Sequence, residues 1–338
     1  MLSFISMIGI TYLDHVGSAL YCESQLENYL QELKSQVYSN PHSRNASSKH
    51  TTQTIDQMRD TVLQYFNVNS NDYSLIFTSG CTDALKIIHD SFQWYNLQQD
   101  TDEFNSDKDT FNSYATEVQP CFCYLEDNHT SVIGIRQAIP PSNGIITCVS
   151  TQAVEMADTT NNKIECQPLN SDNLPEQQSI QASKKITTTD NFTINHLFAY
   201  PAQSNFSGRK YPLQWIDKIR SAQLIPKCVN TGKNDRWYVL LDAASYISTS
   251  RLDLKRYKAD FIPISFYKLF GFPTGLGALI VRNDAAEVLK KQYFGGGTIE
   301  TCLYHADFTS FKTAFHEKLV DISISVIHAT SPSFAPHQ

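Results

Sequence analysis

Residues 265–281 read SFYKLFGFPTGLGALIV and set a lysine beside a loop that is rich in glycine. Lys268 follows an apolar run of strand length, and Gly271, Gly275 and Gly277 come directly after it. Glycines let the backbone of such a loop approach a ligand or a neighbouring segment closely. A lysine taken alone is usually a surface residue, but this setting makes Lys268 a candidate for chemistry.

Further apolar runs of strand length lie upstream, separated by segments compatible with helices. They cover residues 74–78, 121–125, 145–149, 197–200 and 238–241. Continuous apolar strands are typical of a mostly parallel sheet covered by helices on both faces. The sequence therefore predicts an α/β fold. Helical spacing of apolar residues predicts two early helices, over 24–38 and 54–66.

The composition is that of a globular protein of 338 residues, with 41% hydrophobic and 18% charged residues. A net charge of −7 disfavours a role in bulk nucleic-acid binding. No apolar run has membrane-spanning length, so no membrane partner is expected. The eight cysteines include no CxxC pair and are expected as free thiols. With no apparent secretory signal at the start, the expected location is the cytoplasm.

Two polar stretches, about 98–115 and 155–190, are predicted to be surface insertions between packed elements. The expected organisation is one cofactor-binding domain over 1–300, followed by a divergent tail over 301–338.

The residues that follow the strand-length runs form a constellation, because ligands of parallel sheets bind at the carboxyl ends of the strands. Gly80–Thr82 offers backbone N–H groups and a hydroxyl to a phosphate at a helix N-terminus. Asp242 suits the protonated nitrogen of a pyridine ring, and Lys268 suits a Schiff base with an aldehyde. His129 suits stacking on that ring and proton transfer. Together they predict a pyridoxal 5'-phosphate (PLP) site.

Each of these residues also has a simpler interpretation. Asp242 suits a turn or helix cap, and His129 suits an ordinary loop histidine. Asn205 suits a cap for the turn at 206–208. A strand followed by Gly-x-Thr and a helix, as at Gly80–Thr82, occurs in many folds. The case for a site rests on their combination with Lys268.

The sequence resembles the class V aminotransferase-like enzymes of fold type I and, within them, the N-terminal domain of the molybdenum cofactor sulfurases. The resemblance covers roughly 11–300. It is carried by these segments: FTSGCTDALK from Phe77, YLEDNHTSVIGIR from Tyr124, FAYPAQSNFSGRKYPLQWI from Phe198, VLLDAAS from Val239, SFYKLFGFPTGLGALIV from Ser265, and YFGGGT from Tyr293.

The resemblance implies a role for each matching residue. Lys268 is similar to the lysine that holds PLP, Asp242 to the partner of the pyridinium nitrogen, and His129 to the residue stacked on the ring. Asn205 is similar to the group that bonds the phenolic oxygen of PLP. Thr82 and Ser265 resemble phosphate ligands, and Cys81 and Ser245 complete the expected cofactor-binding set. Lys268 and His129 are the expected catalytic residues.

Enzymes of this branch are homodimers that take sulfur from L-cysteine, release alanine and hold the sulfur as a persulfide on a cysteine. Their final acceptor is the molybdenum cofactor. The resemblance implies this activity, these partners and a PLP-dependent sulfurtransferase here. No metal site is expected, because Cys121 and Cys123 would need two further ligands that the sequence does not place.

The chain also departs from the family pattern. Ordinary cysteine desulfurases have His where this chain has Tyr267, and usually Gln where it has Ser245. No cysteine matches the sulfur carrier, since Cys302 comes too soon after Lys268, and the C-terminal small domain is expected to be truncated. Two alternatives therefore stay open: a non-catalytic fragment that binds PLP, and another class V aminotransferase or lyase.

Overall fold

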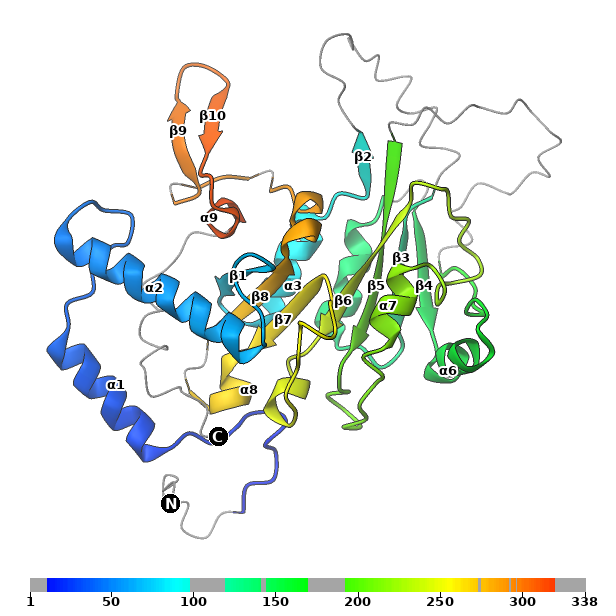
Figure 1. The fold of residues 1–338 in the computed structure, drawn as a ribbon, viewed down its shortest axis with the longest axis horizontal. Helices are drawn as coiled ribbons and strands as arrows, with labels where there is room; N and C mark the ends of the chain where they lie inside the picture. Colours follow the sequence, from blue (N-terminus) through cyan, green and yellow to red (C-terminus); the bar gives the residue numbers. More distant parts are fainter. Residues whose placement is uncertain are drawn as a thin grey trace.

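The computed structural model describes residues 11–97, 119–140, 144–169, 192–272, 275–291, 293–295 and 297–319 (Figure 1). The strands in these ranges are β1 Tyr73–Thr78, β2 Tyr95–Leu97, β3 Cys121–Leu125, β4 Ile145–Val149, β5 Phe192–Pro201, β6 Arg236–Asp242, β7 Phe261–Ser265, β8 Gly277–Arg282, β9 Ile299–Leu303 and β10 Phe308–Phe311. The α-helices are α1 Glu23–Ser35, α2 Ala46–Tyr65, α3 Cys81–Ser91, α5 Thr130–Ile133, α6 Thr151–Thr160, α7 Trp215–Arg220, α8 Phe266–Phe270 and α9 Phe315–Leu319.

One large mixed sheet organises the fold. Its strands run in the order β1-β8-β7-β6-β5-β3-β4, and β2 pairs with β5 off this path. The pairs β7–β6, β6–β5, β5–β3 and β3–β4 are parallel, whereas β8 is antiparallel to both β1 and β7. The antiparallel step from β7 to β8 follows from the short connection through α8, because a parallel crossover needs a longer one. The predicted α/β fold with a mostly parallel sheet is confirmed.

The strand runs predicted from apolarity are all present. β3 and β4 have the predicted bounds, whereas β5 begins five residues before the predicted run at 197–200. Polar residues in that extension are satisfied by tertiary contacts. The Asn195 amide donates to the Gln93 carbonyl at 2.6 Å, and His196 stacks on Trp237 with ring centroids 4.6 Å apart. A polar segment can thus be a buried strand.

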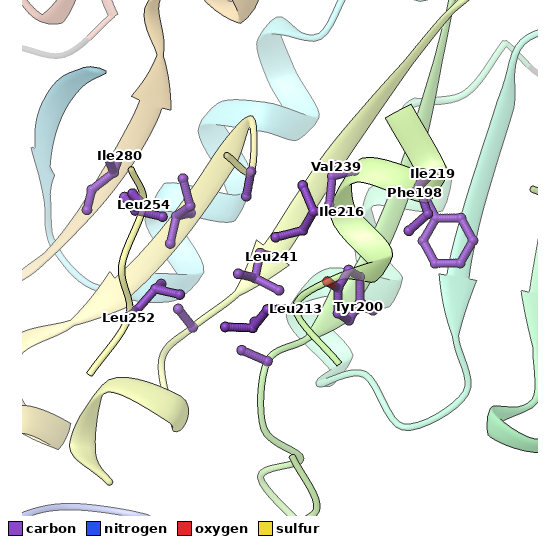
Figure 2. Close-up of a cluster of buried hydrophobic side chains, with 14 of the residues drawn as sticks. Phe198, Tyr200, Leu213, Ile216, Ile219, Val239, Leu241, Leu252, Leu254 and Ile280 are labelled. Atoms are coloured by element: carbon purple, nitrogen blue, oxygen red, sulfur yellow. The ribbon is translucent and has the colours of Figure 1, made fainter. Parts of the chain in front are cut away.

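Alternate side chains of the central strands enter two separate cores, one on each face of the sheet. On β6, Val239 and Leu241 join one core, and Tyr238 and Leu240 join the other. Figure 2 shows Ile216 and Ile219 of α7 beside Val239 of β6. Helix α3 belongs to the second core. Covering both faces explains why these strands read as continuous apolar runs.

Helix α2 begins eight residues before the predicted start at 54. Its cap is Asn45, whose side-chain oxygen accepts a hydrogen bond from the Ser48 N–H at 2.8 Å. The first turns are rich in Ser and Thr, and Thr51 is fully buried with its hydroxyl donating to the Ser47 carbonyl at 3.0 Å. Hydroxyls bonded in this way hide a helix from a search for apolar periodicity.

Helix α1 ends at Ser35, three residues before the predicted end at 38, and none of its side chains is buried. The predicted insertion at 98–115 lies outside the described residues. The second predicted insertion, at 155–190, begins within α6, and its residues 170–190 lie outside the described residues.

The domain boundary predicted at residue 300 falls inside β9. Among the described helices, none has the length and apolarity needed to span a membrane.

A buried carboxylate joins β6, β7 and β8. Asp260 is fully buried, and its side chain accepts from the Val239 N–H at 2.8 Å and from Arg282 Nη2 at 2.7 Å. Its backbone carbonyl accepts from the Arg282 N–H at 2.9 Å. Burial raises the pKa of Asp260, and the positive charges of Arg282 and Arg220 oppose that rise. The charged form of the Asp260 carboxylate is therefore stabilised by these two arginines.

Candidate active site

The carboxyl ends of the central strands, the adjoining loops and the first turns of α3 and α8 surround one cavity. Its lining is Cys81, Thr82, Leu85, Asp127, His129, Ser131, Pro201, Gln203, Asn205, Asp242, Ala244, Ser245, Tyr267 and Lys268. All the residues predicted for the site line this cavity except Ser265, which lies beside it at the end of β7. Residues as far apart in the sequence as Cys81 and Lys268 thus line the same cavity at the carboxyl ends of the strands.

Lys268 lies in α8, directly after β7, and its amine is held by two neighbours. Nζ donates to Asn205 Oδ1 at 2.6 Å and to Ser245 Oγ at 3.2 Å. Ser245 Oγ in turn donates to Asn205 Oδ1 at 3.0 Å. The three side chains form a closed polar group that keeps the amine inside the cavity.

Asp242 ends β6 and presents a buried carboxylate to the same cavity. Its residue is 8% exposed, and Oδ1 accepts from the Ala244 N–H at 3.1 Å. The Cys81 thiol lies 4.0 Å from Oδ1. Burial raises the pKa of Asp242, while the Ala244 N–H, Lys268 and His129 act in the opposite direction. A buried carboxylate with a raised pKa is suited to a cationic N–H donor, which would offset its desolvation.

The first turn of α3, with Ser265 at the adjoining end of β7, is the part of the site suited to a phosphate. The first residues of this eleven-residue helix are Cys81 and Thr82, and helix N-termini attract anions. Thr82 Oγ1 lies 3.0 Å from Ser131 Oγ. Ser265 is fully buried, and its hydroxyl has no hydrogen-bond partner among the described residues. A buried hydroxyl of this kind is available to bond a polar group of a ligand.

Gly277 brings the backbone of the turn before α3 close to β8. It pairs with Ser265 on one side and with Thr78 on the other. A Cβ at this position would lie 2.6 Å from the Ile264 carbonyl oxygen and 2.7 Å from the Gly80 carbonyl carbon. Both are backbone atoms, so a side chain here requires the turn before α3 to move.

A Gly277→Ala variant is therefore expected to lose about 1–3 kcal/mol of stability, because overpacking displaces backbone on two sides. The free energy of unfolding in urea measures the change. Gly134→Ala is the matched control, since Gly134 is helical and a Cβ there meets nothing within 4 Å. A Gly277 variant as stable as that control would contradict the close approach.

His129 is the N-cap of α5. Its Nδ1 accepts a hydrogen bond from the Ser131 N–H at 3.2 Å, which leaves Nε2 as the protonated nitrogen of the neutral ring. The residue is exposed and lines the cavity that contains Asp242 and Lys268. This placement brings the predicted ring-stacking residue to the predicted site.

The structure adds residues that were not predicted for the site, among them Asp127, Ser131 and Gln203. Ser131 lies two residues after His129, in the first turn of α5. Gln203 is buried, and its Oε1 accepts from the Thr249 hydroxyl at 2.6 Å. Their positions just after β3 and β5 are the signal that marks them.

A larger cavity of about 550 Å³ lies elsewhere, between α2, β1 and α9. Arg59 and His316 line it, but none of the predicted site residues do. Its size alone does not make it the site, because it lacks the convergent lysine and buried carboxylate.

Comparison with known proteins agrees with this fold. The E. coli cysteine desulfurase CsdA superposes with a TM-score of 0.60 at 16% identity, over 97% of this chain and 68% of that one. The cystine C-S lyase C-DES, solved with cysteine persulfide, superposes with a TM-score of 0.63 at 17% identity, over 97% of this chain and 71% of that one. An apo cysteine desulfurase from Thermococcus onnurineus superposes with a TM-score of 0.63 at 14% identity, over 94% of this chain and 66% of that one. At these identities the likeness concerns the fold, and the class it defines is that of the fold type I enzymes.

The model of the aminotransferase class V family matches residues 11–107 and 147–317, which is most of the chain. The chain belongs to the class V aminotransferase family. Among curated proteins, it is 43% identical to a molybdenum cofactor sulfurase of Danio rerio over 96% of its own length and 34% of the relative's. The human molybdenum cofactor sulfurase is 42% identical over 96% of this chain and 32% of its own length. The chain thus spans about a third of the length of these relatives.

Proposed function

We propose that this chain binds PLP at the cavity around Lys268. The residues present fit the three reactive parts of that cofactor. The Lys268 amine suits the aldehyde, the buried Asp242 carboxylate suits the protonated ring nitrogen, and the first turn of α3 with Ser265 suits the phosphate. Asn205 and Ser245 would bond the phenolic oxygen beside Lys268. His129 would lie against the ring.

PLP supplies an electron sink for carbanion chemistry on amino acids. The protein's own residues set up that chemistry. Asp242 would keep the ring nitrogen protonated, because a buried carboxylate stabilises an adjacent cation. The Lys268 amine would act as a proton carrier at the substrate carbon, and His129 would be able to move a second proton.

We propose further that the substrate is L-cysteine and that the chain is the desulfurase portion of a molybdenum cofactor sulfurase. The C–S bond of cysteine would break, alanine would be released, and the sulfur would pass to an acceptor thiol as a persulfide. The molybdenum cofactor would be the final acceptor. Identity of 43% to a named sulfurase over 96% of this chain supports this substrate, together with the cavity that converges on Lys268.

The test is alanine formation by the purified full chain supplied with PLP, L-cysteine and a dithiol as sulfur acceptor. Alanine and sulfide in equal amounts are the expected products. Other L-amino acids are the control for substrate class. Turnover of another amino acid without C–S cleavage would replace the proposal by a different class V lyase or aminotransferase.

A second candidate is a chain that binds PLP but transfers no sulfur. It is favoured by the position of Cys81, the cysteine among the cavity-lining residues, whose thiol faces the buried Asp242. Burial raises the pKa of Cys81 well above its usual value, so it is a poor sulfur acceptor. PLP binding without alanine formation, even with added dithiol, would favour this candidate.

We also propose that the chain is a cytoplasmic homodimer. Free cysteines are compatible with a reducing compartment. The hairpin β9–β10 exposes Leu303, Tyr304, Phe308 and Phe311, an apolar surface that a second copy would cover. Sedimentation of the purified chain would show twice the monomer mass if this proposal is correct.

A further inference from the structure

Two segments distant in sequence run side by side beyond the ends of α6 and α7. The Ile164 N–H donates to the Ile225 carbonyl, and the Lys227 N–H donates to the Ile164 carbonyl, both at 2.8 Å. These bonds make a parallel bridge between Ile164 and Pro226. Continuing that register by two residues places Cys166 opposite Cys228.

The neighbouring residues confirm that the register continues. Lys227 Nζ lies 2.6 Å from Glu165 Oε1, and both side chains are exposed. Because side chains alternate along a bridge, Ile164 and Pro226 turn inward, Glu165 and Lys227 turn outward, and the two cysteines turn inward again.

The two sulfur atoms lie 3.5 Å apart, and each cysteine is half-buried. Strands paired in this way lie about 4.8 Å apart, which is within the Cα separation that a disulfide spans. A bond therefore needs the sulfurs to close by about 1.5 Å, a side-chain movement. The backbone is already in place.

The local chemistry separates this pair from the other buried thiols. The pKa of Cys166 is lowered to about 6, chiefly because the Cys228 thiol donates a hydrogen bond to its sulfur. Burial raises the pKa values of Cys121 and Cys123 on β3, which are fully buried. Thiolate is the reactive form, so Cys166 is the activated member of the group.

We propose that Cys166 and Cys228 form a redox-active dithiol, which small-molecule disulfides of the glutathione class oxidise to an intramolecular disulfide. The Cys166 thiolate attacks the small disulfide and forms a mixed disulfide, releasing one small thiol. The Cys228 thiol then loses its proton and attacks the Cys166 sulfur, which releases the second small thiol. Two cysteines are oxidised by two electrons, and one small disulfide is reduced.

The bond would join two residues that are 62 positions apart and would close a loop that contains β5 and α7. Such a crosslink restricts the unfolded chain, so the oxidised protein is expected to melt higher by about 4 °C or more. This inference does not rest on the proposed function, because neither PLP nor cysteine takes part.

The test equilibrates the full chain with glutathione buffers of increasing oxidised fraction, followed by acid quenching, alkylation and peptide mass spectrometry. One crosslink is expected, joining the peptides of Cys166 and Cys228 with the loss of two hydrogen atoms. In Cys228→Ser, glutathione should remain attached to Cys166 instead. Cys302→Ser, which removes an exposed thiol, is the matched control and should behave as the wild-type chain.

A second measurement needs no variant. At pH 6.5 iodoacetamide is expected to label Cys166 faster than Cys228, because the pKa of the Cys166 thiol is lowered and that of the Cys228 thiol is raised. The proposal is overturned if the wild-type chain takes up glutathione without closing the crosslink. It is also overturned if the chain stays reduced in fully oxidised glutathione, or if other cysteine pairs crosslink to the same extent.

Discussion

A Lys268→Ala variant is expected to lose the absorbance band at the edge of the visible region that the wild-type chain forms with PLP. The amine at this position lies 2.6 Å from Asn205 Oδ1 inside the candidate site and is the group available to the aldehyde there. Alanine formation from cysteine is expected to fall by about 10²–10⁴-fold or more, because the proton carrier is lost as well. Absorbance spectra before and after borohydride, with an alanine assay, measure both effects.

Lys258→Ala is the matched control, since Lys258 is an exposed lysine that does not line the cavity. It should keep the band and its removal by borohydride. Circular dichroism of both variants checks that each is folded. A band that survives in folded Lys268→Ala would mean that PLP reacts with another amine, and the assignment of the site would then be wrong.

An Asp260→Ala variant is expected to lose about 3–5 kcal/mol of stability, the range for breaking a buried charge pair. The change leaves the buried Val239 N–H without its acceptor and removes the Arg282 partner at 2.7 Å. The strands β6, β7 and β8 are joined at this point, so the loss falls on the centre of the sheet. Urea unfolding gives the free energy directly.

Asp284→Ala is the control for this variant, because Asp284 contacts the same arginine from the surface. Its Oδ2 lies 2.8 Å from Arg282 Nη1, and its side chain is 63% exposed. A surface ion pair contributes about 0–1 kcal/mol, so this variant should remain close to wild type. Equal losses of stability in Asp260→Ala and Asp284→Ala would show that burial does not determine how much each ion pair with Arg282 contributes.

Much of the fold could be predicted because the apolar runs report burial directly. The runs at 121–125 and 145–149 have the bounds of β3 and β4, since strands covered on both faces are apolar throughout. The early part of β5 and the first turns of α2 could not be predicted. Their Asn, His, Ser and Thr side chains are satisfied by hydrogen bonds and ring contacts with segments that the local sequence does not identify.

The site shows the same division. Residues that follow predicted strands, such as Asp242 and Asn205, could be selected from the sequence because ligands bind at the carboxyl ends of parallel strands. The pairing of Cys166 with Cys228 could not be found in this way, since 62 positions separate the two residues and no motif joins them. Only the parallel bridge between their segments makes them neighbours.

By itself, the sequence determined the α/β class, the strand runs and the identity of the residues that converge on Lys268. Each of these can be read from the local sequence, because an apolar run followed by a polar residue marks the end of a buried strand. The tertiary structure decided which atoms meet: Lys268 with Asn205 and Ser245, Asp260 with Arg282, and Cys166 with Cys228. Distances of this kind depend on strand order and register, which are set by the packing of the whole sheet.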